Sequence, residues 1–186
     1  MQVTSITVDS FYSNIDSVRS FALAQSFDVK GNYPGARSKA FLLQDIKDSI
    51  QGIVGGVAGS ITNWYEQDGL SGSFQIATAI DRTWIHTDHF NKWAGVCYLT
   101  PDAPLSSGTG FYKHKPTGRT RSLGPQDTTG YESYDYTKWD MVDRVGNVYN
   151  RLILYRGDLF HASLDYFGSN LQDGRLFQVF FFDTQY

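Results

Sequence analysis

Two of the four histidines of this sequence lie close together in the stretch "WIHTDHF", residues 84–90, with an aspartate between them. In an extended strand, side chains at positions i and i+2 point to the same face. If this stretch is a strand, His86 and Asp88 therefore share one face, while Thr87 and His89 take the other. The pattern predicts either the beginning of a metal site or a polar patch beside a tryptophan.

A metal site would need a third ligand from elsewhere, and the other histidines are His114 and His161. His161 follows the turn "RGD" and opens a short apolar stretch, so we expect it at the rim of a sheet, where ligands often lie. Two histidines and one carboxylate hold one face of a metal ion and leave other positions open, as in non-haem Fe(II) oxygenases. His114 lies between two lysines, and we expect it at the surface rather than at a metal.

A single arginine opens the apolar stretch "RLFQVFFFD" near the end of the chain. By the alternation of a strand, Arg175 shares a face with phenylalanine and valine side chains. A guanidinium among apolar rings is costly unless an anion accompanies it, and its fork of donors suits a carboxylate. The alternative is an arginine at a strand end that reaches water or pairs with Asp173 or Asp183.

The remaining sequence indicates which elements position these residues. A chain of 186 residues is long enough for one sizeable core, and 16% aromatic residues with 18 glycines favour a β-rich fold. Helical spacing predicts a helix from residue 14 or 16 to about 25 and another over 41–54. We therefore expect one domain over residues 1–186, with helical support in 1–56 and a β body in 57–186. The polar piece 117–143 is expected to be a long functional loop.

The overall composition excludes several classes of partner and location. The net charge is −3 without runs of like charge, so we expect neither nucleic acid nor a membrane as partner. Cys97 is the only cysteine, which favours a reducing compartment. The sequence shows no apolar stretch of membrane-spanning length and no secretory signal. These features predict a cytoplasmic protein.

The order His86-x-Asp88, then His161, then Arg175 resembles the Fe(II)/2-oxoglutarate-dependent oxygenase superfamily, and most closely its small prolyl-hydroxylase-like members from phage and bacteria. Flanking segments such as "GVCYLTPD" and "RGDLFHAS" extend the resemblance over most of the chain. The resemblance implies a mainly β fold with N-terminal helices, a double-stranded β-helix or jelly roll. It also implies that His86, Asp88 and His161 hold Fe(II) as the catalytic metal ligands, and that Arg175 binds the distal carboxylate of 2-oxoglutarate.

Many members of that superfamily place a tyrosine or small polar residue against the same carboxylate. Tyr98 is the first candidate here and Tyr112 a weaker one, although a core tyrosine is an equal alternative for Tyr98. The step of fourteen residues from His161 to Arg175 is longer than in many members. If Arg175 were misplaced, Arg151 or Arg156 would be the substitutes.

The resemblance implies a dioxygenase that uses 2-oxoglutarate and dioxygen, hydroxylates an unidentified small molecule or peptide, and releases succinate and CO2. A cupin-type isomerase is an alternative that keeps His86 and His161 but does not need Arg175. A non-catalytic jelly roll, such as a lectin or virion module, needs none of these residues. A dinuclear metallohydrolase could also use the "HxDH" stretch, but such sites usually need more histidines.

Several basic residues could border the mouth of a pocket and would suit an acidic substrate. A solvated loop explains them equally well, and we favour that interpretation. They are Arg37, Lys113, Lys115, Arg119 and Arg121.

Overall fold

The computed structural model describes residues 2–66 and 69–186. The strands in these residues are β1 (Ser5–Val8), β2 (Ala36–Ala40), β3 (Ser60–Asn63), β4 (Ser73–Ala77), β5 (Trp93–Tyr98), β6 (Thr109–His114), β7 (Trp139–Val145), β8 (Leu152–Arg156), β9 (His161–Ser163) and β10 (Arg175–Gln185). The helices are α1 (Ile15–Leu23) and α2 (Gln44–Ala58), with the short 3-10 helices η1 (Leu105–Ser107), η2 (Thr128–Glu132) and η3 (Tyr136–Lys138).

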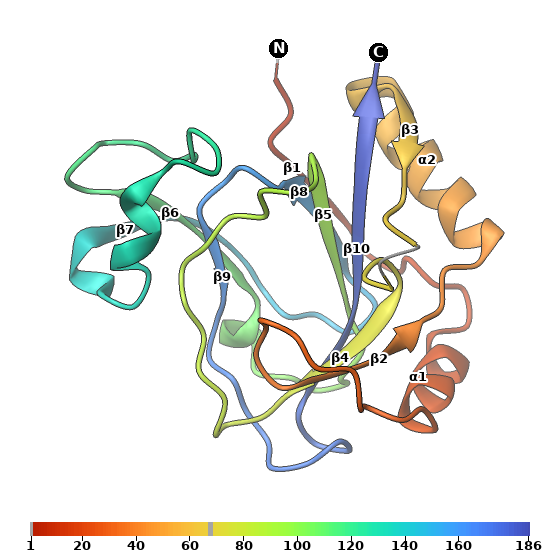
Figure 1. Cartoon of the computed structure of the whole chain (residues 1–186). Helices are drawn as coiled ribbons and strands as arrows, with labels where there is room; N and C mark the ends of the chain where they lie inside the picture. Colours follow the sequence, from red (N-terminus) through yellow and green to blue (C-terminus); the bar gives the residue numbers. More distant parts are fainter. Residues whose placement is uncertain (1, 67–68) are drawn as a thin grey trace.

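Two antiparallel sheets form the body of the described chain (Figure 1). The larger has seven strands in the order β1-β8-β5-β10-β4-β2, with β3 paired to β10. The smaller has three strands in the order β7-β6-β9. Strands that are neighbours in the larger sheet are mostly distant in sequence. The central strands β5 and β10 are paired on both sides, so neither exposes an unpaired edge along the paired residues.

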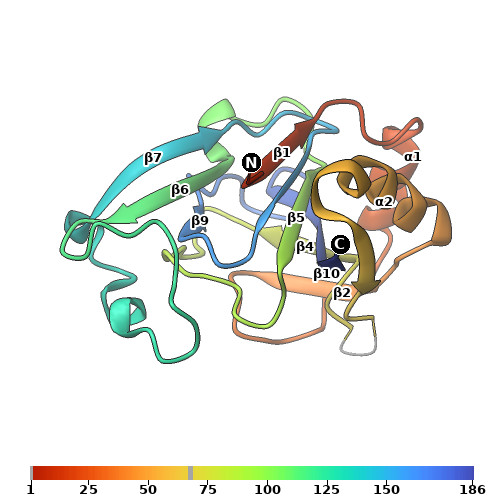
Figure 2. The ribbon, with the colours of Figure 1, turned by 90° about the horizontal axis from the view of Figure 1, so that it is seen from above.

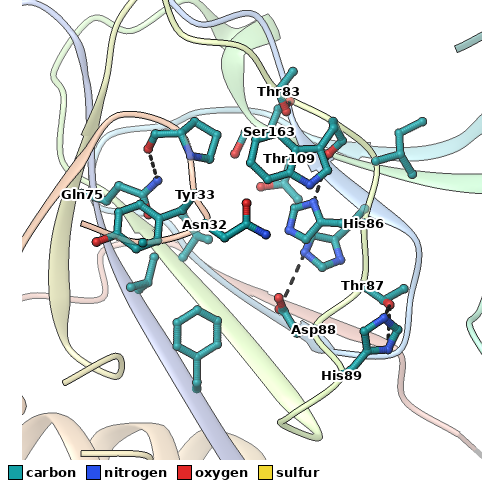
Figure 3. A pocket seen from close by; sticks show the side chains of 18 of the residues that line it. Asn32, Tyr33, Gln75, Thr83, His86, Thr87, Asp88, His89, Thr109 and Ser163 are labelled. Atoms are coloured by element: carbon teal, nitrogen blue, oxygen red, sulfur yellow. Dashed lines mark hydrogen bonds and ion pairs between the residues drawn. The ribbon is translucent and has the colours of Figure 1, made fainter. Parts of the chain in front are cut away.

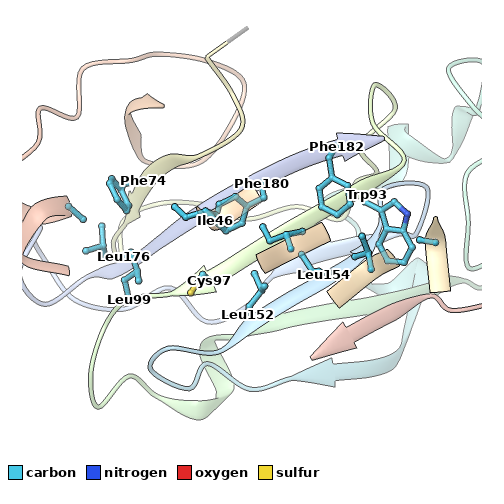
Figure 4. Close-up of a cluster of buried hydrophobic side chains, with 14 of the residues drawn as sticks. Ile46, Phe74, Trp93, Cys97, Leu99, Leu152, Leu154, Leu176, Phe180 and Phe182 are labelled. Atoms are coloured by element: carbon cyan, nitrogen blue, oxygen red, sulfur yellow. The ribbon is translucent and has the colours of Figure 1, made fainter. Parts of the chain in front are cut away.

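Both helices pack on the outer face of the larger sheet (Figures 1 and 2). In α2, Ile46, Ile50, Val54 and Ala58 recur every four residues and are buried, so one stripe of the helix faces the sheet. This stripe packs in one cluster with Trp93, Leu154, Phe180 and other apolar side chains on the outer face of the sheet (Figure 4). Asn14 precedes α1 as expected, but its side chain makes no capping hydrogen bond.

The inner face of the larger sheet carries the residues that alternate along each strand with those of the outer face. Phe177, Val179 and Phe181 of β10 belong to a second buried cluster that also includes Phe111 of the smaller sheet. The alternation expected for the "RLFQVFFFD" stretch is therefore confirmed, and Arg175 lies on this inner face with them. The space between the two sheets is where the site lies.

The order of elements differs from the sequence expectation in three places. Residues 36–40 form β2, so residues 1–56, which we expected to be helical support, also contribute this strand to the larger sheet. Residues 139–145 form β7, which begins inside the piece 117–143 that we expected to be loop. Residues 84–90 form no regular strand, and their ladder pairing is an isolated bridge at His86.

The hairpin of β6 and β7 extends away from the helices, and the segment between these strands folds back beside it (Figure 2). Strand β7 is largely exposed, which its lack of continuous apolar residues allows. Among the described residues, no helix is long and apolar enough to cross a membrane.

Candidate metal centre

His86, Asp88 and His161 come together in the structure as the sequence predicts. One potential ligand atom from each residue lies within 4.8 Å of the others. Oδ2 of Asp88 is 3.7 Å from Nε2 of His161, and the centroids of the two imidazole rings are 4.4 Å apart. Three donor atoms at this spacing can surround one metal ion from one side.

The backbone brings these residues together through a short antiparallel contact. The amide of His86 donates to the carbonyl of His161 at 2.9 Å, and the reverse bond has the same length. The amide of Asp88 donates to the carbonyl of Gly157 at 2.8 Å. A Cβ atom on Gly157 would lie 2.5 Å from the carbonyl oxygen of Asn91, so only glycine lets this turn approach so closely.

Backbone carbonyls also fix the orientation of both imidazoles. Nδ1 of His86 lies 3.0 Å from the carbonyl oxygen of Trp84, and Nδ1 of His161 lies 2.8 Å from that of Leu159. A carbonyl can only accept, so in each ring Nδ1 carries a proton, and Nε2 is the nitrogen that can offer a lone pair to a metal ion. This is how proteins commonly present neutral histidine to a metal ion. His89 instead contacts the hydroxyl of Thr87, away from the cluster.

Burial keeps His161 neutral. Removal from water, together with the nearby His86, lowers the pKa of His161 from 6.5 to about 4, and Asp88 opposes this only in part. At neutral pH the ring is therefore uncharged, and Nε2 can bind a metal ion without first losing a proton.

A cavity of about 610 Å³ opens beside the three residues. Its lining includes aromatic side chains such as Trp84, Phe90 and Phe181. Figure 3 shows His86 and Asp88 on one side of this space, Tyr33 and Gln75 on the other, and Asn32 between them. A cavity of this volume is typical of sites for small molecules.

Arg175 is fully buried directly behind the cavity wall. Its Nε donates to the carbonyl of Ser107 at 2.8 Å, and Nη2 donates to that of Gly108 at 3.2 Å. Its guanidinium carbon lies 4.3 Å from the ring centroid of Phe177, which lines the cavity. Nη1 has no hydrogen-bond partner among the described residues. A buried guanidinium nitrogen in this state indicates a missing acceptor.

Tyr98 lies beside Arg175, whereas Tyr112 does not belong to this group. The ring centroid of Tyr98 is 5.4 Å from the guanidinium carbon, and its hydroxyl is 2.8 Å from the hydroxyl of Thr109, a cavity residue. Tyr112 packs in a separate cluster with Trp139. The two substitute arginines have other roles. Arg151 binds Asp9 through two nitrogens, and Arg156 lies 3.9 Å from Asp158.

His114 is buried, so the expectation of a surface residue is wrong. Its Nε2 lies 2.6 Å from Oε2 of Glu132, and Nδ1 lies 3.0 Å from the hydroxyl of Thr117. The ring also packs against Trp139 at 4.6 Å between centroids. The lysines beside it in sequence suggested exposure, but strand alternation turns His114 to the opposite face, and its acid partner lies eighteen residues away.

Of the five basic residues expected at a pocket mouth, only Arg37 lines the cavity. Arg119 and Arg121 pair with Asp127 and Asp158, respectively. Lys113 and Lys115 both lie near Asp140. Sequence reasoning missed Gln75 as a cavity residue, because nothing in its local sequence marks it.

Comparison with known proteins places the chain in a family. A model described as a family of unknown function, DUF6445, matches residues 2–182. The chain belongs to the DUF6445 family. A comparison with curated proteins gives no match for this DUF6445 chain.

Solved structures show the fold of this DUF6445 chain. HygX from Streptomyces hygroscopicus, with nickel and 2-oxoglutarate bound, matches over 100% of this chain and 84% of its own, at 10% identity and a TM-score of 0.67. The α-ketoglutarate-dependent epimerase SnoN from nogalamycin biosynthesis matches over 97% and 78%, at 12% identity and a TM-score of 0.62. A prolyl-4-hydroxylase from Pseudomonas putida matches over 98% and 94%, at 12% identity and a TM-score of 0.52.

These likenesses confirm the predicted fold class. The DUF6445 chain has the mainly β fold of Fe(II)/2-oxoglutarate oxygenases, with two antiparallel sheets and two helices on one of them. It also carries the His-Asp-His group in the order of that superfamily. At these identities the comparisons establish the fold and leave the reaction to be argued from the site.

Proposed function

We propose that this chain is a non-haem Fe(II)- and 2-oxoglutarate-dependent dioxygenase. In this proposal His86, Asp88 and His161 hold the iron, and Arg175 binds the distal carboxylate of 2-oxoglutarate. The observation that carries it is the convergence of three donor atoms within 4.8 Å in the same interior as a buried guanidinium nitrogen without a partner. Neither the cupin isomerase nor the non-catalytic alternative needs that nitrogen.

The donor set suits ferrous iron. Two neutral imidazoles and one carboxylate on one side of an ion are the ligands that non-haem Fe(II) oxygenases use. The carbonyls of Trp84 and Leu159 would hold both rings with Nε2 toward the ion. Iron bound there would supply the redox chemistry that couples decarboxylation of 2-oxoglutarate, to succinate and CO2, to oxidation of a second substrate by dioxygen.

The groups behind the cavity wall suit the carboxylate of 2-oxoglutarate. Arg175 already gives two of its nitrogens to carbonyls, so Nη1 is left for an anion, and the hydrogen-bonded hydroxyls of Tyr98 and Thr109 lie nearby with one further O–H to donate. Phe177 covers Arg175 on the cavity side, and we expect it to shift when the carboxylate enters. HygX, which has the same fold, was crystallised with nickel and 2-oxoglutarate bound, and this supports the assignment.

The aromatic lining would exclude water from the reacting groups, which favours oxidation of the substrate over side reactions. The substrate itself is a small molecule or peptide segment that fits a cavity of about 610 Å³ together with 2-oxoglutarate. HygX was also crystallised with nickel, 2-oxoglutarate and hygromycin B bound, so this fold accepts a further small molecule beside 2-oxoglutarate.

The test is the visible charge-transfer band of the Fe(II)–2-oxoglutarate chelate, recorded without oxygen. The wild-type protein should show it. Arg175→Met should bind Mn(II) with unchanged affinity but weaken 2-oxoglutarate binding by roughly 10- to 100-fold, the loss of a charge-assisted hydrogen bond. Arg151→Met, which removes an arginine paired with Asp9 outside the cavity, is the matched control and should leave the band unchanged.

The other outcomes identify the alternatives. Metal binding without any response to 2-oxoglutarate would favour a cupin-type metal protein, and binding of neither would favour a non-catalytic jelly roll. If Arg175→Met folds and retains wild-type affinity for 2-oxoglutarate, the assignment of Arg175 is wrong. Succinate release without an added second substrate would independently support the oxygenase.

A further inference from the structure

A second buried cation faces the cavity from the side opposite the metal centre. Arg37 of β2 is 9% exposed and lines the same cavity as His86, Asp88 and His161. It lies apart from Arg175, which is behind the wall and lines no part of that cavity. The proposed oxygenase chemistry gives Arg37 no role.

The chain holds Arg37 in one position. In the register of β2 and β4, Arg37 lies directly opposite Gln75. Its Nε donates to Oε1 of Gln75 at 2.7 Å, and Nε2 of Gln75 donates in turn to the carbonyl of Pro34 at 2.7 Å. The guanidinium carbon lies 3.9 Å from the ring centroid of Tyr33, a distance at which the ring stabilises a cation.

The turn before β2 is equally fixed. Gly35 has a φ of +72°, and a Cβ atom there would lie 1.9 Å from the carbonyl oxygen of Ile76. Only glycine allows the turn to lie this close to β4. Tyr33 and Pro34, which contact Arg37 and Gln75, are therefore set in place by the backbone. Figure 3 shows Tyr33 and Gln75 together, with Asn32 between them and His86.

The two terminal nitrogens of Arg37 have no hydrogen-bond partner among the described residues. Neither Nη1 nor Nη2 makes a hydrogen bond to a residue that the structure describes, and no described carboxylate lies within 4.0 Å of the guanidinium. Burial lowers the pKa of Arg37 to about 10, so the side chain is still a cation at neutral pH. Asp88 is near enough to raise that pKa slightly, but it forms no ion pair with Arg37.

A fixed guanidinium with two free donors in a partly enclosed cavity is a preformed anion site. A buried cation is costly unless an anion accompanies it. The two donors of a guanidinium edge match the two oxygens of a carboxylate, and one cation balances its single charge. Lys30, the other cation of the lining, is exposed and its charge is screened by water.

We propose that Arg37 binds the carboxylate of the second substrate, which is accordingly a small organic acid with an apolar or aromatic body. The body would lie among Trp84, Phe90 and Phe181 of the lining, between Arg37 and the metal centre. This inference rests on the proposed oxygenase function and names the substrate class of the same site. Arg175 would then bind 2-oxoglutarate, and Arg37 would bind the second substrate.

The test compares each of three carboxylates with its own neutral amide: benzoate, 3-phenylpropionate and indole-3-acetate. Binding is measured by calorimetry or ligand-observed NMR on the full chain loaded with Mn(II) and saturated with 2-oxoglutarate, so that the site at Arg175 is already filled. At least one carboxylate should bind the wild-type protein about tenfold more tightly than its amide, which corresponds to about 1.4 kcal/mol. Arg37→Met should reduce this ratio to about one, and Arg37→Lys should keep part of it.

Lys39→Met, which removes an exposed cation two residues along β2, is the matched control and should keep the full ratio. The proposal is overturned if no carboxylate binds the wild type more tightly than its amide, or if the preference survives in Arg37→Met. If Arg37→Met does not fold, the wild-type ratios and Arg37→Lys decide. The chelate band is recorded first: its absence refutes the oxygenase function, whereas a band without any carboxylate preference refutes only the role of Arg37.

Discussion

His161 and His114 lie in similarly buried regions but differ in the hydrogen-bond partners of their ring nitrogens. Both histidines are 3% exposed, and each packs against an aromatic ring. Both nitrogens of His114 are bonded to side chains, to Glu132 at 2.6 Å and to Thr117 at 3.0 Å. His161 bonds one nitrogen to a backbone carbonyl and leaves the other facing His86 and Asp88, at 3.7 Å from the carboxylate.

The difference teaches that burial and a nearby acid do not by themselves mark a metal ligand. At His114 the acid is at hydrogen-bonding distance, and the ring ties the segment between β6 and β7 to the smaller sheet. At His161 the carboxylate of Asp88 is too far from Nε2 for a hydrogen bond. The spacing instead leaves room for a metal ion between the donor atoms of His86, Asp88 and His161. A free Nε2 with an anchored Nδ1 is the feature that separates a candidate ligand from a structural histidine.

The largest expected effect is on metal binding. His161→Ala should weaken Mn(II) or Fe(II) binding about 1,000-fold, or about 4 kcal/mol. Loss of a residue that only hydrogen-bonds to a metal ligand weakens metal affinity up to roughly 100-fold, and loss of a ligand itself should cost more. His114→Ala should destabilise the fold but leave the metal affinity within about twofold. Both affinities are measured by anaerobic calorimetry on variants shown by circular dichroism to be folded. Equal losses in the two variants would erase the distinction between the two regions.

The next effect concerns pH and the metal-free protein. Burial lowers the pKa of His161 from 6.5 to about 4 on folding, so between these values the unfolded chain holds the extra proton. The stability due to neutral His161 is therefore fully present above pH 6.5 and is lost as the pH falls toward 4. Between pH 7 and 5 the loss should be about 2 kcal/mol.

Urea unfolding in the presence of a chelator measures this loss, and His161→Gln is the control. The variant should lose about 2 kcal/mol less than the wild type over the same pH interval, since carboxylates common to both proteins cancel. Parallel stability curves for the two proteins would show that folding does not lower the pKa of His161, so that the folded ring is charged at pH 5. Its Nε2 would then not be free for a metal ion at pH 5.

Local periodicity was sufficient to predict a β-rich body with helices before it, and the superfamily resemblance implied the double-stranded β-helix and the grouping of His161 with His86 and Asp88. Alternation placed His86 and Asp88 together and put Arg175 on the inner face of β10, and the superfamily resemblance supplied the order of strands. The convergence was predictable even though residues 84–90 form only an isolated bridge.

The features that the sequence did not reveal depend on contacts between distant segments. β2 is five residues long and contains Arg, Ser and Lys, so its composition resembles a loop, and its pairing with β4 makes it a strand. The burial of His114 requires Glu132 to fold back over β6. Arg37 faces the cavity because of the same β2–β4 register, and no local pattern in the sequence predicts that register.

The smallest effect should come from Glu132, and it tests whether the two regions are independent. Glu132→Gln keeps a hydrogen-bonding side chain beside His114 but removes the charge. Because Glu132 is 36% exposed, solvent screens the pair, and the loss of stability should be about 0.5–1 kcal/mol in urea unfolding. Amide exchange should rise in residues 117–138 and stay unchanged around His86 and His161. A tenfold loss of metal affinity in this variant would instead show that the segment beside β6 helps to hold the metal centre, and that the two histidines belong to one coupled site.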